Sequence, residues 1–301
     1  MYTRILIATG GSPWSDAAAA YAIALAAQMG ADLCILTVLN VSGVYAMPDV
    51  MASSELLMES VEQQGQEMLA HTAARAIHAG VPHVALLKWG NVAETILQTA
   101  VEEQCDLIVL GSRGLSGFKR LMLGSISNAV AAKAQCPVLV IKQPPLAPVR
   151  WRRILVATGG SPWSDAAVDH AIELARVQQL RVCLLYVDQR RSRRMDSLLS
   201  LTSDGKNILA LAEARAAASG VPYEAKLAQG DVTTSILATA TEQQCDVIIL
   251  GSRGLTGFKR LMLGSTSNAV SVPRRSRFAL SRSIASSLPR APPGGLVVSP
   301  P

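Results

Sequence analysis

The stretch Ile5 to Ala18, ILIATGGSPWSDAA, occurs a second time as Ile154 to Ala167, ILVATGGSPWSDAA. A second stretch, Gly111 to Val130, returns as Gly251 to Val270 with 18 of 20 residues identical. The chain has 301 residues, about twice the commonest domain length of roughly 150 residues. The sequence therefore predicts two related domains in tandem.

Each copy alternates short apolar runs with segments of helical length. The runs in the first copy are rich in Val, Ile and Leu and cover residues 4–9, 33–39, 83–87, 107–110 and 138–141. Such runs are typical of parallel strands that are buried on both faces. Ser12 before Pro13 indicates the start of a helix, and Gly80 indicates the end of one. The pattern predicts an α/β fold in which each copy is a doubly wound parallel sheet.

The boundaries of the two units follow from the repeat. We expect a first domain at residues 1–142, a proline-rich linker at 143–150 and a second domain at 151–272. After Val270 the second copy has no apolar run like residues 138–141. We therefore expect the second domain to lack its fifth strand, and the Arg-, Pro- and Ser-rich tail at 273–301 to be disordered.

Composition excludes several classes of protein. Half of the residues are apolar, which is typical of a globular chain. The longest apolar run, residues 17–27, is too short for the roughly 20 residues of a membrane-spanning helix. The start of the chain does not resemble a signal peptide, so we expect a cytoplasmic protein that does not engage a membrane.

Charge and cysteine usage argue against a nucleic-acid partner, a metal site and a disulfide framework. The formal net charge is +6, but five arginines after Ser271 account for most of it, and the body is nearly neutral. No aromatic side chains interleave the basic clusters, so we expect no nucleic-acid partner. The five cysteines include no C-x-x-C pair, which favours reduced, buried thiols over a metal site or a disulfide framework.

The segment repeated with 18 identities contains a glycine loop. The apolar run 106–110 ends in Gly111-Ser-Arg-Gly114, and nine residues later Gly124-Ser125 precedes a helical segment. Ligands of open α/β sheets bind at the carboxyl ends of strands, and the N-terminus of a helix favours anions. The loop is consistent with a phosphate site, in which Arg113 would offset phosphate charge. A tight turn followed by a serine cap is the structural alternative.

The spacing G-x2-G-x9-G-[ST] resembles the ATP-binding signature of the universal stress protein family. It occurs at Gly111, Gly114, Gly124 and Ser125, and again at Gly251, Gly254, Gly264 and Ser265. The Gly-Ser turn after the first strand and the closing run at residues 136–141 are also similar to that family. The resemblance implies five-stranded sheets of order 3-2-1-4-5 and ATP as the ligand, with or without Mg²⁺.

The resemblance also implies which residues would hold the nucleotide. In the first copy the phosphates and ribose would contact Gly111, Arg113, Gly114, Gly124 and Ser125, and the adenine would lie near Ala8, Thr9 and Val38. In the second copy the corresponding residues are Gly251, Arg253, Gly254, Gly264 and Ser265, with Ala157, Thr158 and Val187 near the base. ATP-binding members usually carry an acid just before the Gly-Ser turn, where this chain has Gly10 and Gly159.

These observations predict an ATP-binding, non-catalytic stress sensor or regulator that acts through an unidentified protein partner. Strand five pairs between domains in the family, so we expect a homodimer through residues 138–141 of the first domain. A nucleotide-independent interaction module is the alternative of a different class. A slow ATPase is less favoured, because none of the four histidines is duplicated with the loop and no general base is evident.

Overall fold

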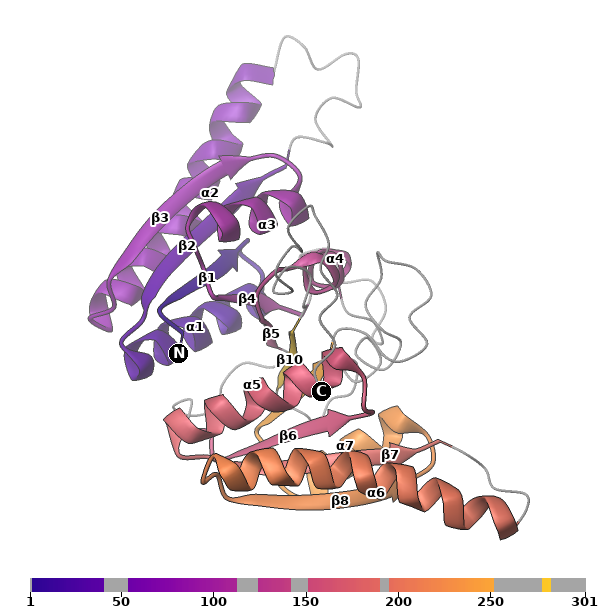
Figure 1. Cartoon of the computed structure of the whole chain (residues 1–301). Coiled ribbons are helices and arrows are strands. Elements are labelled where there is room, and N and C mark those ends of the chain that lie inside the picture. The colour runs from indigo at the N-terminus through magenta and orange to yellow at the C-terminus, as the bar shows by residue number, and fades with distance from the viewer. Residues whose placement is uncertain are drawn as a thin grey trace, which may run out of the picture.

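The computed structural model describes residues 2–40, 54–112, 124–141, 151–189, 195–251 and 278–282 (Figure 1). The elements of the first half are β1 (Arg4–Thr9), α1 (Pro13–Met29), β2 (Asp32–Leu39), α2 (Ser54–His78), β3 (His83–Trp89), α3 (Val92–Glu102), β4 (Leu107–Gly111), α4 (Ser125–Lys133) and β5 (Val138–Ile141). The second half contains β6 (Arg153–Thr158), α5 (Pro162–Gln178), β7 (Arg181–Asp188), α6 (Met195–Ala218), β8 (Tyr223–Gln229), α7 (Val232–Glu242), β9 (Val247–Gly251) and β10 (Phe278–Arg282).

The helix that follows the first strand begins where the sequence predicts. The Ser12 hydroxyl accepts a hydrogen bond from the Ser15 amide at 3.1 Å, and the Ser15 hydroxyl oxygen accepts one from the Ser12 amide at 2.9 Å. This capping box satisfies two amides that would otherwise lack partners, and Pro13 has no amide to satisfy. Ser161 and Ser164 repeat the arrangement at the start of α5.

The strands form parallel sheets with the predicted order. The first half has the order β3-β2-β1-β4-β5, and the second half repeats it as β8-β7-β6-β9. In the first half the register aligns Ile7 of β1 with Ile35 of β2 and with Val109 of β4. In the second half Val156 of β6 pairs with Leu184 and Ile249 in the same way. The predicted fold class is therefore confirmed.

Helices cover both faces of each sheet (Figure 1). Helices α1 and α2 pack on one face of the first sheet, and α3 and α4 pack on the other. On the α1 face the buried apolar side chains of the two halves form one continuous cluster, whereas the clusters under α3 and α7 remain separate. None of the described helices is both long and apolar enough to cross a membrane.

One element differs from the expectation. Residues Phe278–Arg282, within the tail that we expected to be disordered, form β10, which pairs in parallel with β9 at the position of a fifth strand. The prediction that the second domain lacks this strand is wrong. The edge of β9 carries unpaired backbone groups beside an apolar core, so a short extended segment gains hydrogen bonds by pairing there. The remainder of the 273–301 tail lies outside the described residues.

The same strand joins the two halves. β10 also pairs with β5 in antiparallel orientation, with Ala279 opposite Val140 and Leu280 opposite Leu139, so the sheets form one ten-stranded sheet. Both edges of β5 are thus hydrogen-bonded within the chain, to β4 and to β10. β10 therefore occupies the edge of β5 at which we expected a second chain to pair, and the homodimer through residues 138–141 stays a prediction.

We predict that removal of β10 changes the association state. A chain that ends at residue 272 would leave the edges of β5 and β9 unpaired, and exposed apolar edges pair with other chains. We expect this truncation to form dimers or larger species by size-exclusion chromatography with light scattering. A chain that ends at residue 285 keeps β10 and should behave like the full-length protein. Identical association states for both truncations would contradict the role assigned to β10.

Candidate functional site

The carboxyl ends of β1 and β4 form the switch point of the first sheet. The two strands are neighbours, and the chain leaves β1 toward one side of the sheet and β4 toward the other. The Ser112 carbonyl, just after β4, accepts a hydrogen bond from the Gly124 amide at 2.9 Å. This bond brings the two described ends of the glycine loop together at the edge where doubly wound sheets bind ligands.

The start of α4 is open. Gly124 is the N-cap residue, with φ −57° and ψ 149°, and no side chain of the described residues caps the helix. By contrast, Ser12 caps α1 and Asn91 caps α3 through their side-chain oxygens. The side chain of Ser125, the first helical residue, is exposed. The first turn of α4 therefore presents amide groups and the positive end of the helix dipole toward the surface.

Two polar side chains in this turn have different roles. The Ser127 hydroxyl is buried and donates to the Gly124 carbonyl at 3.1 Å, so it stabilises the turn and does not face a ligand. The Asn128 side-chain oxygen is buried and has no hydrogen-bond partner among the described residues. An unpaired acceptor of this kind is costly unless a donor reaches it, which makes Asn128 a candidate contact for a bound molecule.

Apolar side chains lie on the same face of the sheet as α4, at the carboxyl ends of β1 and β2. Ala8 at the end of β1 and Val38 at the end of β2 are both partly buried and belong to the α3 side of the sheet. Val92 and Ala93 from the first turn of α3 pack against the same cluster. Together these four residues form an apolar floor that suits a flat base more than a charged group.

Thr9 is placed differently from Ala8. Successive side chains of a strand point to opposite faces, so Thr9 lies on the α1 face together with Ile5 and Ile7. Its counterpart Thr158 shows this directly, because the Thr158 hydroxyl lies 3.4 Å from the Ser164 hydroxyl at the start of α5. The side chains of Thr9 and Thr158 are thus directed away from the apolar floor.

The glycine at the end of β4 is explained by packing. A Cβ atom on Gly111 would lie 2.6 Å from the Trp14 carbonyl carbon and 2.9 Å from the Ser15 amide nitrogen. Gly251 has the same relation to Trp163, at 2.8 Å. The first turn of the helix after β1 therefore sits directly on this strand end, and only glycine leaves room for it.

Gly10 and Gly159 occupy the positions where the resemblance noted in the sequence implies an acidic residue. An added Cβ would meet no atom within 4 Å at either position, and neither residue has a positive φ. Space and backbone geometry thus permit a side chain there. The surrounding structure therefore does not explain why these two positions are glycine and not an acid.

The second half reproduces the apolar floor. Ala157, Val187 and Val232 are partly buried and pack against the cluster under α7, as Ala8, Val38 and Val92 pack against the cluster under α3. Thr233 stands where the first half has Ala93. The cap of the neighbouring helix differs, because Asp231 replaces Asn91. Hydrogen bonds from the Thr234 amide and hydroxyl, both 2.8 Å long, hold the pKa of Asp231 below its ordinary value. The second site therefore carries a negative charge where the first is neutral.

The structure brings together part of the predicted site. Ala8, Val38, Gly111, Gly124 and Ser125 meet at one edge of the first sheet. Six predicted contacts lie outside the described residues, namely Arg113, Gly114, Arg253, Gly254, Gly264 and Ser265.

Sequence reasoning missed Val92 and Ala93 of the apolar floor, the Asn128 side chain, and the Ser112 carbonyl that holds the start of α4. The pairs Gly90-Asn91 and Gly230-Asp231 indicate the start of a helix, because a glycine is followed by a capping residue. This signal could have shown that Val92 lies in the first turn of a helix. Ser112 acts through its backbone carbonyl and Asn128 through an unpaired oxygen. Neither property is visible in a sequence pattern.

Comparison with known proteins identifies the family. The model of the universal stress protein family matches residues 1–142 and again residues 150–271. The two matches cover most of the chain, and the chain therefore belongs to the universal stress protein family, with two copies of the domain in tandem.

Three relatives illustrate the likeness. Universal stress protein MJ0531 of Methanocaldococcus jannaschii is 37% identical over 145 residues, covering 48% of this chain and 84% of its own length. Universal stress protein Rv2005c of Mycobacterium tuberculosis is 27% identical over 283 residues, covering 88% of this chain and 92% of its own. The crystal structure of a universal stress protein from Archaeoglobus fulgidus superimposes with a TM-score of 0.73 at 23% identity, covering 93% of this chain and 95% of that one.

We predict that Gly111→Ala destabilises the fold while Gly10→Ala does not. The new methyl group at position 111 would collide with the backbone of α1, and overpacking of this kind costs about 1 to 3 kcal/mol. The methyl group at position 10 meets open space. Urea unfolding followed by circular dichroism should show a lower midpoint for Gly111→Ala alone. Equal midpoints would mean that the close approach of α1 is not a constraint.

Proposed function

We propose that this protein is a nucleotide-binding regulator of the universal stress type that binds ATP without hydrolysing it. Family membership supports a nucleotide as the class of ligand, and the duplicated glycine loop supports a phosphate contact in each half. The protein partner through which such a regulator would act, and its cytoplasmic location, stay predictions from the sequence.

The observation that carries the proposal is the position of the uncapped α4. Its open first turn is held against the end of β4 by the Gly124 to Ser112 hydrogen bond, and the apolar floor of Ala8, Val38, Val92 and Ala93 lies on the same face of the sheet. An anion-binding helix start next to a flat apolar surface matches the two ends of a nucleotide.

The residues present fit ATP in their chemistry. Ser125 and the amides that follow Gly124 would donate hydrogen bonds to phosphate oxygens, and Asn128 would accept one from a donor group. Ala8 and Val38 would contact the adenine ring. Mg²⁺ would accompany the phosphates and reduce their charge.

A second candidate function is a nucleotide-independent interaction module. The packing of Gly111 and Gly251 against the helix after the first strand favours it, because those two glycines are required by the fold whether or not a ligand binds. The uncapped helix start and Gly124 have no such structural reason among the described residues. Direct binding measurements distinguish the two functions.

We predict that titration calorimetry with millimolar ATP and Mg²⁺ detects binding, and that Gly124→Val weakens binding in the first half at least tenfold. Valine tolerates the backbone angles of Gly124 but blocks approach of phosphate to the helix amides. Gly264→Val is the matched change in the second half and should leave the first site intact. Mass spectrometry of the natively purified protein provides an independent check for retained nucleotide.

Three results would contradict this proposal. Absence of heat with ATP, together with absence of retained nucleotide, would favour the interaction module. Unchanged binding in a Gly124→Val, Gly264→Val double variant would place the ligand elsewhere. Steady release of phosphate above a heat-treated control would favour an ATPase.

We also predict that Gly10→Asp strengthens binding of ATP to the first half. The position has space for the side chain, and a carboxylate would supply a nucleoside contact that this chain lacks. Hydrogen bonds to charged groups contribute about 1.5 to 3 kcal/mol, so we expect a gain of roughly tenfold or more in affinity. Gly10→Asn is the neutral control, with a smaller gain expected. Weaker binding for the aspartate than for the asparagine would show that the base does not lie at this position.

A further inference from the structure

The ten-stranded sheet ends in two edge strands, β3 and β8, each seven residues long (Figure 1). Among the described residues β3 pairs only with β2, and β8 pairs only with β7. The outer edge of each strand therefore presents backbone amides and carbonyls that no described strand pairs with. Such an edge is a template for pairing with another chain, and natural proteins often prevent this with charged side chains.

The backbone groups at the outer edge of β8 belong to its odd-numbered residues. The amide of Val182 on β7 donates to the carbonyl of Pro222, just before β8, at 2.9 Å. Backbone groups alternate between the two edges of a strand, so the residues that bond to β7 are 224, 226 and 228. The amides and carbonyls of Tyr223, Ala225 and Leu227 are therefore directed to the free edge.

The side chains of β8 combine exposed apolar groups with a pair of opposite charges. Tyr223 and Leu227, on one face of the sheet, are 41% and 40% exposed. Glu224 and Lys226 lie on the other face, where the Lys226 ammonium is 3.9 Å from the Glu224 carboxylate and 2.6 Å from the carboxylate of Glu242 on α7. The edge thus carries an acid and a base two residues apart, flanked by two apolar side chains.

This order makes the edge complementary to itself in an antiparallel pairing. When Ala225 of one copy lies opposite Ala225 of another, Glu224 lies opposite Lys226 and Tyr223 lies opposite Leu227, and a two-fold axis repeats each contact. The odd-numbered residues of the two strands then exchange backbone hydrogen bonds. The Glu224 to Lys226 pairs fall at the positions between these bonds, where opposing side chains lie closest.

The charges also select this register. A shift by two residues keeps the backbone hydrogen bonds of an antiparallel pair. In one direction it would place Glu224 opposite Glu224, and in the other direction Lys226 opposite Lys226. Like charges directly opposite one another destabilise a pair of strands. Among these three registers, only the one centred on Ala225 brings opposite charges together.

Strand β3 has the same backbone arrangement without the charge pattern. The Leu33 amide of β2 donates to the Pro82 carbonyl at 2.9 Å, as the Val182 amide does to Pro222. Residues 83–89 include Lys88 but no acidic residue. Two copies of β3 therefore bring no opposite charges together in any register, and Lys88 opposes pairing as charged side chains on edge strands do.

We propose that the outer edge of β8 is an interaction surface for a second copy of this chain, which pairs antiparallel with Ala225 opposite Ala225. The sheet would continue from one molecule into the other, and the two-fold axis would close the assembly as a dimer. The candidate nucleotide sites lie at the ends of other strands, so the interface depends on neither nucleotide binding nor the proposed function.

The test measures the association of the full-length protein by sedimentation velocity over a range of concentrations. We expect a reversible equilibrium between monomer and dimer. Lys226→Glu would place Glu opposite Glu twice, and Glu224→Lys would place Lys opposite Lys twice. Each variant should weaken the dimer by roughly tenfold or more. Melting curves from circular dichroism show whether each variant remains folded.

Exchange of the charges separates pairing between two chains from effects within one chain. A Glu224→Lys, Lys226→Glu double variant restores both opposite-charge pairs across the interface and should regain the dimer. An equimolar mixture of the two single variants should form heterodimers, because one chain then carries two lysines and the other two glutamates. Neither rescue repairs the contact of Lys226 with Glu242 within a chain, so a merely local effect would not be reversed.

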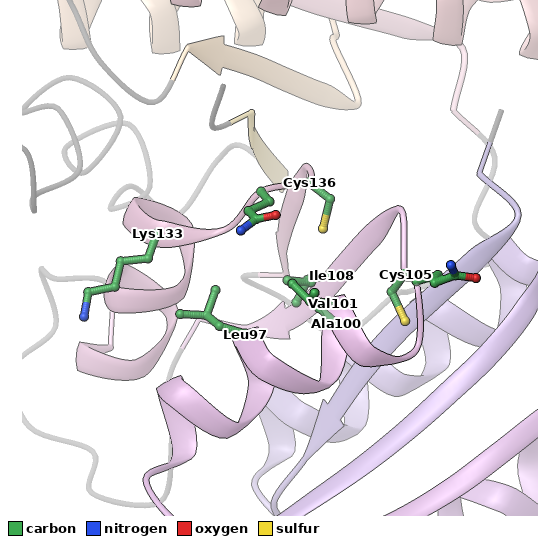
Figure 2. A pocket seen from close by; sticks show the side chains of 9 residues that line it. Leu97, Ala100, Val101, Cys105, Ile108, Lys133 and Cys136 are labelled. Carbon is green, nitrogen blue, oxygen red and sulfur yellow. The ribbon is translucent and has the colours of Figure 1, made fainter. Parts of the chain in front are cut away.

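Two matched controls lie away from β8. Lys88→Glu alters the corresponding ion pair of β3, in which the Lys88 ammonium is 2.7 Å from the Glu102 carboxylate. Val101→Glu alters a side chain that is 56% exposed and lines an open pocket between α3 and α4 (Figure 2). Both controls should dimerise like the wild type, whereas Leu227→Glu should weaken the dimer.

A protein that stays monomeric at every concentration would overturn this proposal. A dimer that withstands both single charge reversals would also overturn it, because the chains would then meet at another surface. Growth beyond the dimer with rising concentration would indicate head-to-tail pairing of β8 with β3 of the next molecule, which contradicts the two-fold arrangement.

Discussion

The contact on which the rest of this structure depends is the approach of the first turn of α1 to the end of β4. The backbone of Trp14 and Ser15 lies where a Cβ of Gly111 would be, and the second half repeats the contact with Trp163 and Gly251. This approach fixes the position of the turn after β1 relative to β4. The carbonyl of Ser112 follows directly, and it holds the start of α4 through Gly124. This one backbone contact therefore positions the end of β4, the start of α4 and the candidate site between them.

One short helix in each half contributes both to the apolar floor and to the position of a cysteine. In the first half this helix is α3. Its first turn supplies Val92 and Ala93 to the apolar floor, and the turn after its last residue carries Cys105. Helix α7 does the same with Val232 and Cys245. The apolar floor and a buried or partly buried cysteine therefore lie at opposite ends of one short helix in each half.

The two halves are joined by more than the linker. Strand β10 pairs with both β5 and β9, and the buried side chains on the α1 face form one cluster across the junction. At the amino end of the first half, the Tyr2 hydroxyl lies 2.7 Å from Nε2 of His170 on α5. The two halves therefore share one continuous ten-stranded sheet and one apolar cluster.

The sequence by itself determined the repeat and the helix starts, because these depend on local patterns. The strand order followed from the family resemblance, because strand order depends on pairing between distant segments. Apolar runs such as residues 107–110, the Ser12-Pro13 cap and the duplicated glycine loop are each readable within a few residues. Gly124 and Ser125 could be predicted as site residues from the glycine loop, whereas Ala8 and Val38 were predicted only from the family resemblance. Only the tertiary structure decided what depends on distant segments. The composition of the arginine-rich tail does not predict the five-residue strand β10. This segment is extended because it pairs with β5 and β9. Gly111 serves helix packing, and Asn128 is left with an oxygen that has no partner among the described residues, because each of these properties arises between residues that the chain brings together only on folding.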